Sequence, residues 1–388
     1  MNQALTFKAL KVNQPIGEFF ITSMGSKDLQ KIAYADMCRL SGTKKLDIEG
    51  MRDVTVDDYT GWQRKLNATR VDDIKQFVQQ PDACFPTGII LSVDSRCAQW
   101  DEEKSELCLS EYVDNENSHN SIGMGQIARI LDGQHRLAGL EGFDETFELN
   151  VSIFVGLDIA EQAYIFSTVN LAQTKVNKSL VYELFDSAKK RSPQKLCHQI
   201  AVALDSIKTS PFYKRIKRLG CATPNRKNET ITQAAFVQAL MPYLTENENL
   251  DRELYARGKD IELGDSPKTC FRFLMKNQKD LELTQILYNY FIAVRDRWPK
   301  SWGSEEQGQM LNKTNGFRAL MRLLPLIYAD LRIKVGEVPS QEFFLKAITN
   351  LPFQDGSFTV DVYKPGSTGE SDLLKALKME YEKIRNTK

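Results

Sequence analysis

The stretch RILDGQHRLAGL, residues 129–140, decides the fold expected for the first half of the chain. A strand-like run, QIARIL, leads into Asp132 and Gly133, and a helical pattern follows with His135 and Arg136. Glycine has no Cβ, so it lets the backbone turn sharply and approach a ligand closely. The stretch therefore predicts a strand, a tight turn and a helix that begins with two strongly polar side chains.

The beginning of this predicted helix has the chemistry of a phosphate site. The first N–H groups of a helix lack partners within it and carry partial positive charge, so they bind anions. Arg136 suits phosphate geometry, and His135 can donate a hydrogen bond or move a proton. Asp132 can hold a divalent cation, cap the helix or orient a neighbour. The alternative is a common Asp-Gly turn followed by a solvated helix surface.

The sequence around this stretch alternates between strand and helix patterns up to about residue 184. Residues 98–125 are polar and acidic, and we expect them to form a mobile excursion, with a lid over the cleft as one interpretation. Strands are predicted at 17–24, 88–94, 126–131 and 147–157, and helices at 27–40, 67–80, 135–142 and 158–170.

The second half of the chain is predicted to be helical. Several segments carry an apolar stripe of helical period, and the last one is a charged amphipathic helix that allows a dimer. We therefore expect an α+β fold in which a mixed-sheet domain, residues 1–186, precedes an all-helical domain, residues 187–388.

The composition fits a cytoplasmic globular protein. The 388 residues include 51 basic and 51 acidic side chains, so the net charge argues neither for nor against a nucleic-acid partner. The seven cysteines form no CxxC pair, which indicates reduced thiols. The sequence shows no secretory signal pattern and no apolar run of the roughly 18–20 residues that a membrane span requires.

One basic segment combines aromatic and cationic residues in the way that nucleic-acid surfaces do. SPFYKRIKRLG, residues 210–220, contains Lys214, Arg215, Lys217 and Arg218, which we predict to contact DNA. The alternative is a solvated helix face. A second aromatic–basic patch spans 295–302 and 313–322, where the tryptophans are expected to pack the helical domain.

The remaining histidines are weaker candidates for chemistry. His119 lies in a polar stretch and is expected to be exposed. His198 lies on a helical pattern, where a packed or surface position is expected. Adjacent helical residues do not face each other, so Cys197 does not form a pair with it.

Three elements of the sequence resemble the DGQHR-domain family, which includes the DndB proteins of DNA phosphorothioate modification. The first is the pentapeptide itself, and the resemblance covers about residues 14–186. The upstream element is Gln63, Arg64, Leu66, Asn67, Arg70 and Ile74, and the downstream element is Phe166, Asn170 and the Lys-Ser-Leu run 178–180.

The family is similar in layout to the ParB/sulfiredoxin superfamily, and this resemblance implies a nucleotide site. Gly133, Gln134, His135 and Arg136 would contact phosphates, with Gln63, Arg64 and Arg70 lining the same cleft. Asn170 would share Mg²⁺ with Asp132. The chain departs from the ParB pattern at Val169 and Gln173, which argues against CTP chemistry of the ParB type. It departs from the sulfiredoxin pattern at Gln134, which replaces the cysteine, and this argues against sulfiredoxin chemistry.

The resemblance implies a protein of DNA modification and antiphage defence that binds and hydrolyses a nucleoside triphosphate, with ATP favoured. Asp132, His135 and Arg136 would be its catalytic residues, and DNA and other modification proteins its partners. One alternative is a DNA-binding transcriptional regulator without nucleotide turnover. Another is a non-enzymatic scaffold in which the same three side chains form a buried polar network.

Overall fold

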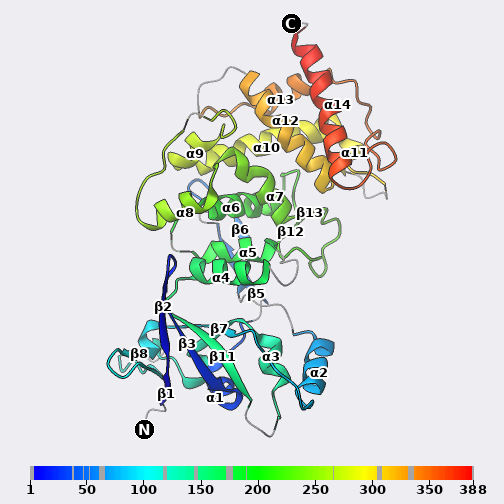
Figure 1. Cartoon of the computed structure of the whole chain (residues 1–388). Helices are drawn as coiled ribbons and strands as arrows, with labels where there is room; N and C mark the ends of the chain where they lie inside the picture. The colour runs from blue at the N-terminus through cyan, green and yellow to red at the C-terminus, as the bar shows by residue number, and fades with distance from the viewer. Residues whose placement is uncertain are drawn as a thin grey trace. The chain divides into compact units, whose positions relative to one another are not determined.

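The chain divides into two compact units in the computed structural model (Figure 1). Unit 1 comprises Met1–Ser41 and Tyr59–Val176, and unit 2 comprises Gly42–Asp58 and Asn177–Lys388. The structure describes residues 4–36, 39–46, 48–51, 53–60, 66–116, 120–143, 147–171, 178–188, 190–264, 266–303, 308–330 and 336–386.

Unit 1 is built on a mixed sheet, six-stranded within the described residues. β11 and β7 are its two central strands and run parallel to each other, β10 is antiparallel to β7, and β3 is antiparallel to both β11 and β2. The strand order is β2 (Leu10–Gln14), β3 (Gly17–Gly25), β11 (Glu148–Val155), β7 (Ile89–Val93), β10 (Ala128–Asp132) and β4 (Ala33–Tyr34).

Side chains from one face of this sheet form the core of unit 1. Leu91, Val93, Ile130, Val151 and Ile153 are buried there. Leu107 and Leu109 of a second sheet, β1 (Ala4–Lys8), β9 (Glu106–Ser110) and β8 (Ala98–Asp101), belong to the same core. Helices α1 (Ser26–Ile32), α2 (Ala68–Phe77) and α3 (Gln134–Gly139) add apolar side chains to it, and α4 (Ile159–Leu171) packs against β10.

One sequence prediction in unit 1 is wrong, and one segment contains strands that the sequence did not predict. The helix predicted at 27–40 ends at Ile32, because Ala33 and Tyr34 leave it to pair with β10 as strand β4. The segment 98–125, the predicted mobile excursion, lies between β7 and β10 and contributes β8 and β9, which pair with each other and, through β9, with β1. Its alternating burial, with Leu107 and Leu109 pointing inward, was hidden by the acidic residues around it.

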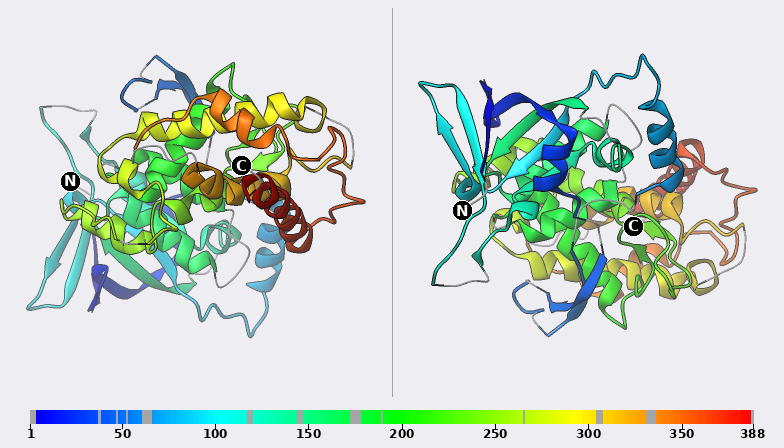
Figure 2. Two further views of the ribbon diagram at one scale, coloured as in Figure 1. Left: turned by 90° about the horizontal axis from the view of Figure 1, so that it is seen from above. Right: turned by 90° about the horizontal axis from the view of Figure 1, so that it is seen from below.

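Unit 2 is mostly helical (Figure 2). Helix α6 (Pro193–Ser206) is buried along almost its whole length, and α14 (Ser367–Asn386) packs on α12 (Thr314–Asp330). The other helices are α5 (Lys178–Leu184), α7 (Gln233–Leu240), α8 (Glu248–Ala256), α9 (Arg272–Lys276), α10 (Asp280–Arg297), α11 (Pro299–Gly303) and α13 (Gln341–Ile348). The expected fold class, a mixed sheet followed by helices, is confirmed.

An aromatic cluster fills the centre of unit 2. The Phe212 ring contacts the rings of Phe236, Phe291, Trp302 and Phe317 at centroid distances of 4.7 to 5.7 Å. Trp302 also donates from Nε1 to the carbonyl oxygen of Pro211 at 3.0 Å. The tryptophans of the second aromatic–basic patch therefore pack the helical core, as expected.

Unit 2 includes one segment that the sequence assigned to the first domain. Strands β5 (Arg39–Lys45) and β6 (Thr55–Thr60) form a small sheet, and the stretch between them inserts Leu46 and Ile48 against α6. Val56 joins the same cluster, which includes Val202 of α6. These apolar contacts, formed across about 150 residues of sequence, attach the segment to the helical unit.

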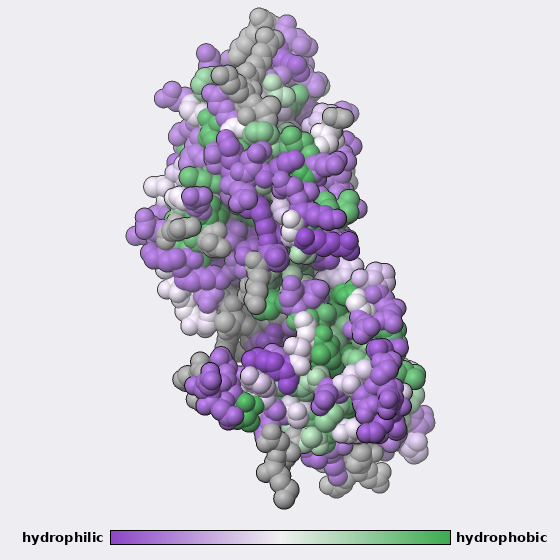
Figure 3. Space-filling model, turned by 90° about the vertical axis from the view of Figure 1, so that its left-hand side faces the viewer, coloured by the Kyte–Doolittle hydropathy of each residue, from purple (hydrophilic) through white to green (hydrophobic). Residues whose placement is uncertain are grey.

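In the view of Figure 3, the surface is mainly hydrophilic, and hydrophobic side chains appear in patches on both units. Leu10 on the edge strand β2 and its cross-strand neighbour Ile21 are among the exposed hydrophobic side chains of unit 1. No helix of the described chain is both long and apolar enough to cross a bilayer.

Candidate functional site

The predicted strand, turn and helix are present in unit 1. Strand β10 ends at Asp132, Gly133 has φ of +102°, and α3 begins at Gln134 without a side-chain cap. A Cβ at Gly133 would lie 2.3 Å from Cδ1 of Ile89 on β7. The position therefore needs glycine for two reasons, the left-handed backbone and the close packing of the neighbouring strand.

Arg136 holds this turn in place. Its Nη1 donates to the carbonyl oxygen and to Oγ1 of Thr87, and its Nη2 donates to the carbonyl oxygen of Gly88 at 3.0 Å. Nη2 also contacts Oδ2 of Asp132 at 2.8 Å, so the two charges neutralise each other. The guanidinium that the sequence assigned to phosphate is thus used to fix α3 to the residues that precede β7.

His135 connects α3 to the start of α2. Its Nε2 accepts a hydrogen bond from the backbone N–H of Asn67 at 3.1 Å, and Asn67 caps α2 by accepting from the N–H of Arg70. Burial, together with the positive charge of Arg70, lowers the pKa of His135 below its usual 6.5, against the opposing effect of Asp132. The ring is therefore neutral at pH 7 and carries its proton on Nδ1.

Gln134 and Arg70 complete the polar surroundings of the turn. The Oε1 atom of Gln134 is buried and accepts no hydrogen bond from any described residue. Buried acceptors nearly always have a donor, so this oxygen calls for one from a ligand or water. Arg70 is exposed and close enough to affect the titration of both His135 and Arg136.

The other residues predicted for this site are placed only in part. Gln63 and Arg64 lie outside the described residues, as does His119. Asn170 lies on α4, but its side chain is not among those that the structure describes. Of the two residues predicted to hold a metal, the structure therefore describes the side chain of Asp132 alone. Among the described residues, no group of three or more His, Cys, Asp or Glu side chains could hold a metal ion.

The predicted DNA-contact residues do not share one surface. Arg218 is 2% exposed, and its Nε and Nη2 donate to the carboxylate of Glu183 while its Nη1 donates to the carbonyl oxygen of Asp57. Arg218 therefore fixes the inserted segment to the helical unit and does not lie on an exposed basic face. His198, 1% exposed, lies beside the same carboxylate, with its Nδ1 3.1 Å from Gln233.

Two of the remaining cations of this segment, Arg215 and Lys217, lie near a third from far along the sequence. Lys214 is exposed and lies over the Tyr213 ring, and Arg215 donates to the carbonyl oxygen of Trp302 at 3.1 Å. Burial and the positive charges of Arg215 and Lys217 lower the pKa of Lys313, which precedes α12. We name Arg215, Lys217 and Lys313 the basic cluster; the sequence placed its members in two separate patches.

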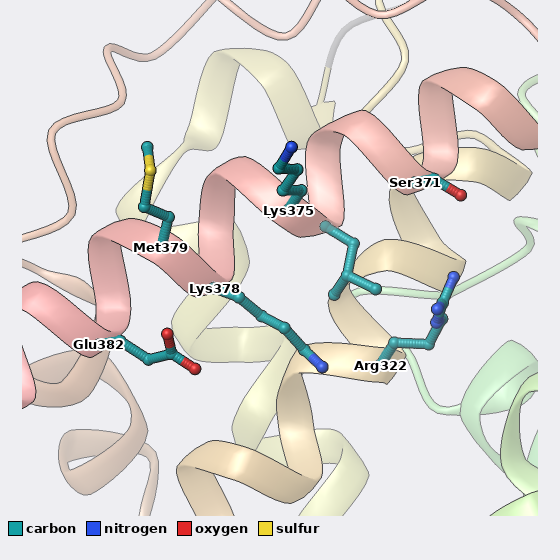
Figure 4. A pocket seen from close by; sticks show the side chains of 7 residues that line it. Arg322, Ser371, Lys375, Lys378, Met379 and Glu382 are labelled. Atoms are coloured by element: carbon teal, nitrogen blue, oxygen red, sulfur yellow. The ribbon is translucent and has the colours of Figure 1, made fainter.

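Sequence reasoning missed a second cationic feature, a groove between α12 and α14 (Figure 4). Its volume is about 350 Å³, and Lys378 extends from α14 towards α12, which carries Arg322. Lys375 and Met379 line it one helical turn apart on α14. The spacing of these residues by three and four in the last predicted helix was the available signal, but the partner helix could not be identified from sequence.

The comparisons with known proteins agree with the family resemblance. The family model DndB, described as DNA-sulfur modification-associated, matches residues 7–264, which is about two thirds of the chain. No curated protein and no solved structure matches the chain. The matched region includes the glycine turn, His135 and Arg136. The chain therefore belongs to the DndB family, whose proteins are associated with DNA sulfur modification.

Proposed function

We propose that this DndB-family protein binds a nucleoside triphosphate, ATP by preference, at the glycine turn and hydrolyses it during DNA modification. The observation that carries the proposal is the set of ligand-type groups around the uncapped start of α3. They are the N–H groups of its first turn, the exposed guanidinium of Arg70, the neutral ring of His135 and the unpartnered Oε1 of Gln134.

Each group suits a different part of a nucleotide. The α3 N–H groups and Arg70 suit phosphate oxygens, and Nδ1–H of His135 can donate to another. Oε1 of Gln134 needs a donor, which a sugar hydroxyl or an exocyclic amino group supplies. Asp132 and Arg136 act as positioning residues, because each already neutralises the other.

The same pairing argues against a resident metal at Asp132. Its carboxylate is neutralised by Arg136, and the side chain of its expected partner Asn170 is not described. Mg²⁺ usually keeps waters and is bound largely through substrate phosphates. We therefore treat Mg²⁺ as part of the nucleotide substrate. Hydrolysis would be attack of water on the terminal phosphorus, which breaks its bond to the bridging oxygen and releases the nucleoside diphosphate and inorganic phosphate. Arg70 and the α3 N–H groups would stabilise the developing charge.

Calorimetric titration with the magnesium complexes of ATP, CTP and GTP tests binding, and phosphate release tests hydrolysis. Arg70→Ala should weaken triphosphate binding at least tenfold, about 1.4 kcal/mol. Lys75→Ala is the matched control, since Lys75 is an exposed cation one to two turns further along α2. Equal binding by both variants, or no binding by the folded wild-type protein, would contradict the proposal.

The second candidate function is DNA binding without turnover, as in a transcriptional regulator, and the basic cluster favours it. Within the described structure, neither Lys217 nor Lys313 forms an ion pair with a carboxylate, so both charges are available to phosphates. DNA affinity should fall steeply with salt, and Lys217→Gln or Lys313→Gln should each lower the slope by about 1. Lys259→Gln, at another exposed lysine of unit 2, should leave it unchanged.

The third candidate, a scaffold, is favoured by the pairing of Asp132 with Arg136, which is the polar network that such a role requires. A scaffold would bind neither nucleotide nor DNA. Wild-type protein that binds neither one, but loses stability on Arg136→Ala, would support it against the other two.

A further inference from the structure

A second pocket lies in unit 1 at the opposite end of β10 from the glycine turn. Its volume is about 510 Å³, within the roughly 300–1,000 Å³ typical of small-molecule sites. It is lined by β4, the ends of β7 and β11, the start of β10 and the start of α4. Arg129 in the pocket and Gly133 at the turn are four strand residues apart, about 13 Å, so the two sites are distinct.

The floor of this pocket is a row of polar side chains across three strands. Tyr34 of β4 is the register partner of Arg129 of β10, which is in turn the partner of Ser92 of β7. Register partners lie on the same face of a sheet, so these three side chains are neighbours. Arg129 confirms this, since its Nε donates to the hydroxyl of Tyr34 at 3.0 Å.

Ser92 is the group that points to a ligand. It is 6% exposed, lines the pocket, and its hydroxyl forms no hydrogen bond with any residue that the structure describes. The hydroxyl is therefore available to a molecule in the pocket. Gln162 of α4 is also buried, and its Oε1 accepts from Arg129 only at 3.4 Å, while its Nε2 donates to the carbonyl oxygen of Leu157 at 2.9 Å.

The two arginines at the pocket are each paired with a carboxylate. Arg129 lies 3.5 Å from a carboxylate oxygen of Asp36, and Arg96 forms two side-chain contacts of 2.8 and 2.9 Å with Asp94. Asp158 and Glu161 place two more carboxylates at the start of α4, where each accepts from the backbone N–H of the other. These carboxylates disfavour an anion, in contrast to the cationic surroundings of the glycine turn.

Aliphatic side chains line several parts of the pocket beside its polar floor. Val93 and Leu157 line one part, and Ile122, Ile127 and Ile159 line others. Aliphatic side chains of this kind pack against the faces of a flat ring, while polar groups at one edge fix its orientation. The pocket therefore combines aliphatic side chains with polar groups that both donate and accept hydrogen bonds, and the two charged residues that line it, Asp94 and Arg129, have opposite signs.

We propose that this pocket binds an uncharged planar heterocycle with hydrogen-bond donors and acceptors on its edge, the chemistry of a nucleobase. Ser92 both donates to and accepts from such an edge, Arg129 donates, and Oε1 of Gln162 accepts. The site does not depend on nucleotide binding at the glycine turn, and the two can be tested separately.

The test is calorimetric titration of the full chain with adenosine, guanosine and cytidine, which are uncharged, and with inorganic phosphate. Ser92→Ala should weaken nucleoside binding at least fivefold. Ser152→Ala is the matched control, because Ser152 lies on the same sheet face two residues from Phe154, the β11 partner of Ser92, but does not line the pocket. Ser95 is exposed on the rim of the pocket, so the larger side chain of Ser95→Trp should block nucleoside binding without changing the core of unit 1.

Three results would overturn the inference. The first is no binding of any nucleoside by folded protein. The second is nucleoside binding that Ser92→Ala and Ser95→Trp leave intact but Arg70→Ala removes, which would locate it at the glycine turn. The third is binding of phosphate that Ser95→Trp abolishes, which would make the pocket an anion site. Binding that the two pocket variants reduce and Arg70→Ala leaves unchanged supports it, whatever the outcome at the turn.

Discussion

Arg136→Ala should destabilise unit 1, because Arg136 acts through protein contacts and not only through a ligand. The substitution removes the donors to two backbone carbonyls and to Oγ1 of Thr87, and it leaves the Asp132 carboxylate without its partner. Removing one member of a buried ion pair costs about 3–5 kcal/mol, and hydrogen bonds to charged groups contribute about 1.5–3 kcal/mol each.

Partial access to water lowers this figure. The Arg136 and Asp132 side chains are 13% and 18% exposed, so water can solvate the carboxylate in the variant. We therefore expect the free energy of unfolding to fall by about 2–4 kcal/mol, the lower part of the range for buried pairs. Arg136→Lys should recover part of the loss, since lysine restores the charge but not the planar fork that reaches several acceptors.

Urea unfolding gives the free energy, and hydrogen exchange of peptides 86–94 and 128–140 shows whether the loss is local. Arg96→Ala is the matched control, an arginine of the same unit whose side chain is 44% exposed and paired with Asp94. Exposed pairs contribute about 0–1 kcal/mol. If Arg136→Ala costs no more than Arg96→Ala and exchange at the turn is unchanged, the positioning role is wrong and Arg136 is free to bind phosphate.

Three further predictions concern single contacts. Gly142→Ala should lower the free energy of unfolding by about 1–2 kcal/mol, because its backbone is left-handed. Gly133→Ala should lower it by about 1–3 kcal/mol more, because the added Cβ also overpacks against Ile89. Equal thermal stability of the two variants would show that the packing at Gly133 is loose. Arg218→Met should destabilise unit 2 by about 3–5 kcal/mol, because it leaves the buried Glu183 carboxylate unpaired. Adding Glu183→Met should restore most of this stability. If urea unfolding shows that the two substitutions have additive costs, they do not form a buried pair. Burial is the main cause that holds the pKa of His135 below 6.5 in the folded protein. As the pH falls, the unfolded chain therefore binds this proton before the folded protein does. The free energy of unfolding should fall as the pH drops below 6.5 and should level off below the folded pKa. His135→Gln should flatten that part of the pH profile, and an unchanged profile would show that His135 does not cause it.

The predicted site shows how far local sequence reasoning reaches. Asp132, Gly133 and the helix after them follow from a few adjacent residues, and the structure has all of them in the expected order. The assignment of Arg136 to phosphate assumed that its guanidinium has no partner within the protein. The residues that engage it, Thr87 and Gly88, lie almost 50 positions earlier, and no periodic pattern connects the two segments.

Burial of charged residues was the hardest feature to predict. Arg218 looks like its exposed neighbour Lys214 in the sequence, because both belong to one basic run. Its burial depends on Glu183 and on the inserted segment around Asp57, which come together only when unit 2 folds. Lys313 shows the opposite case. Its cationic neighbours in the fold, Arg215 and Lys217, lie about 100 residues away in the sequence, so the sequence did not group them with it.

The sequence by itself determined the class of each half of the chain, the glycine turn and the family resemblance, because period, turn residues and motifs are local properties of the chain. The tertiary structure decided which polar groups remain available to a ligand. It paired Arg136 with Asp132, left Oε1 of Gln134 without a partner among the described residues, and placed Ser92 in a pocket at the far end of β10. The physical reason is that a charge or hydroxyl is satisfied by groups near it in space, and strand order and register, which the sequence does not show, determine those neighbours.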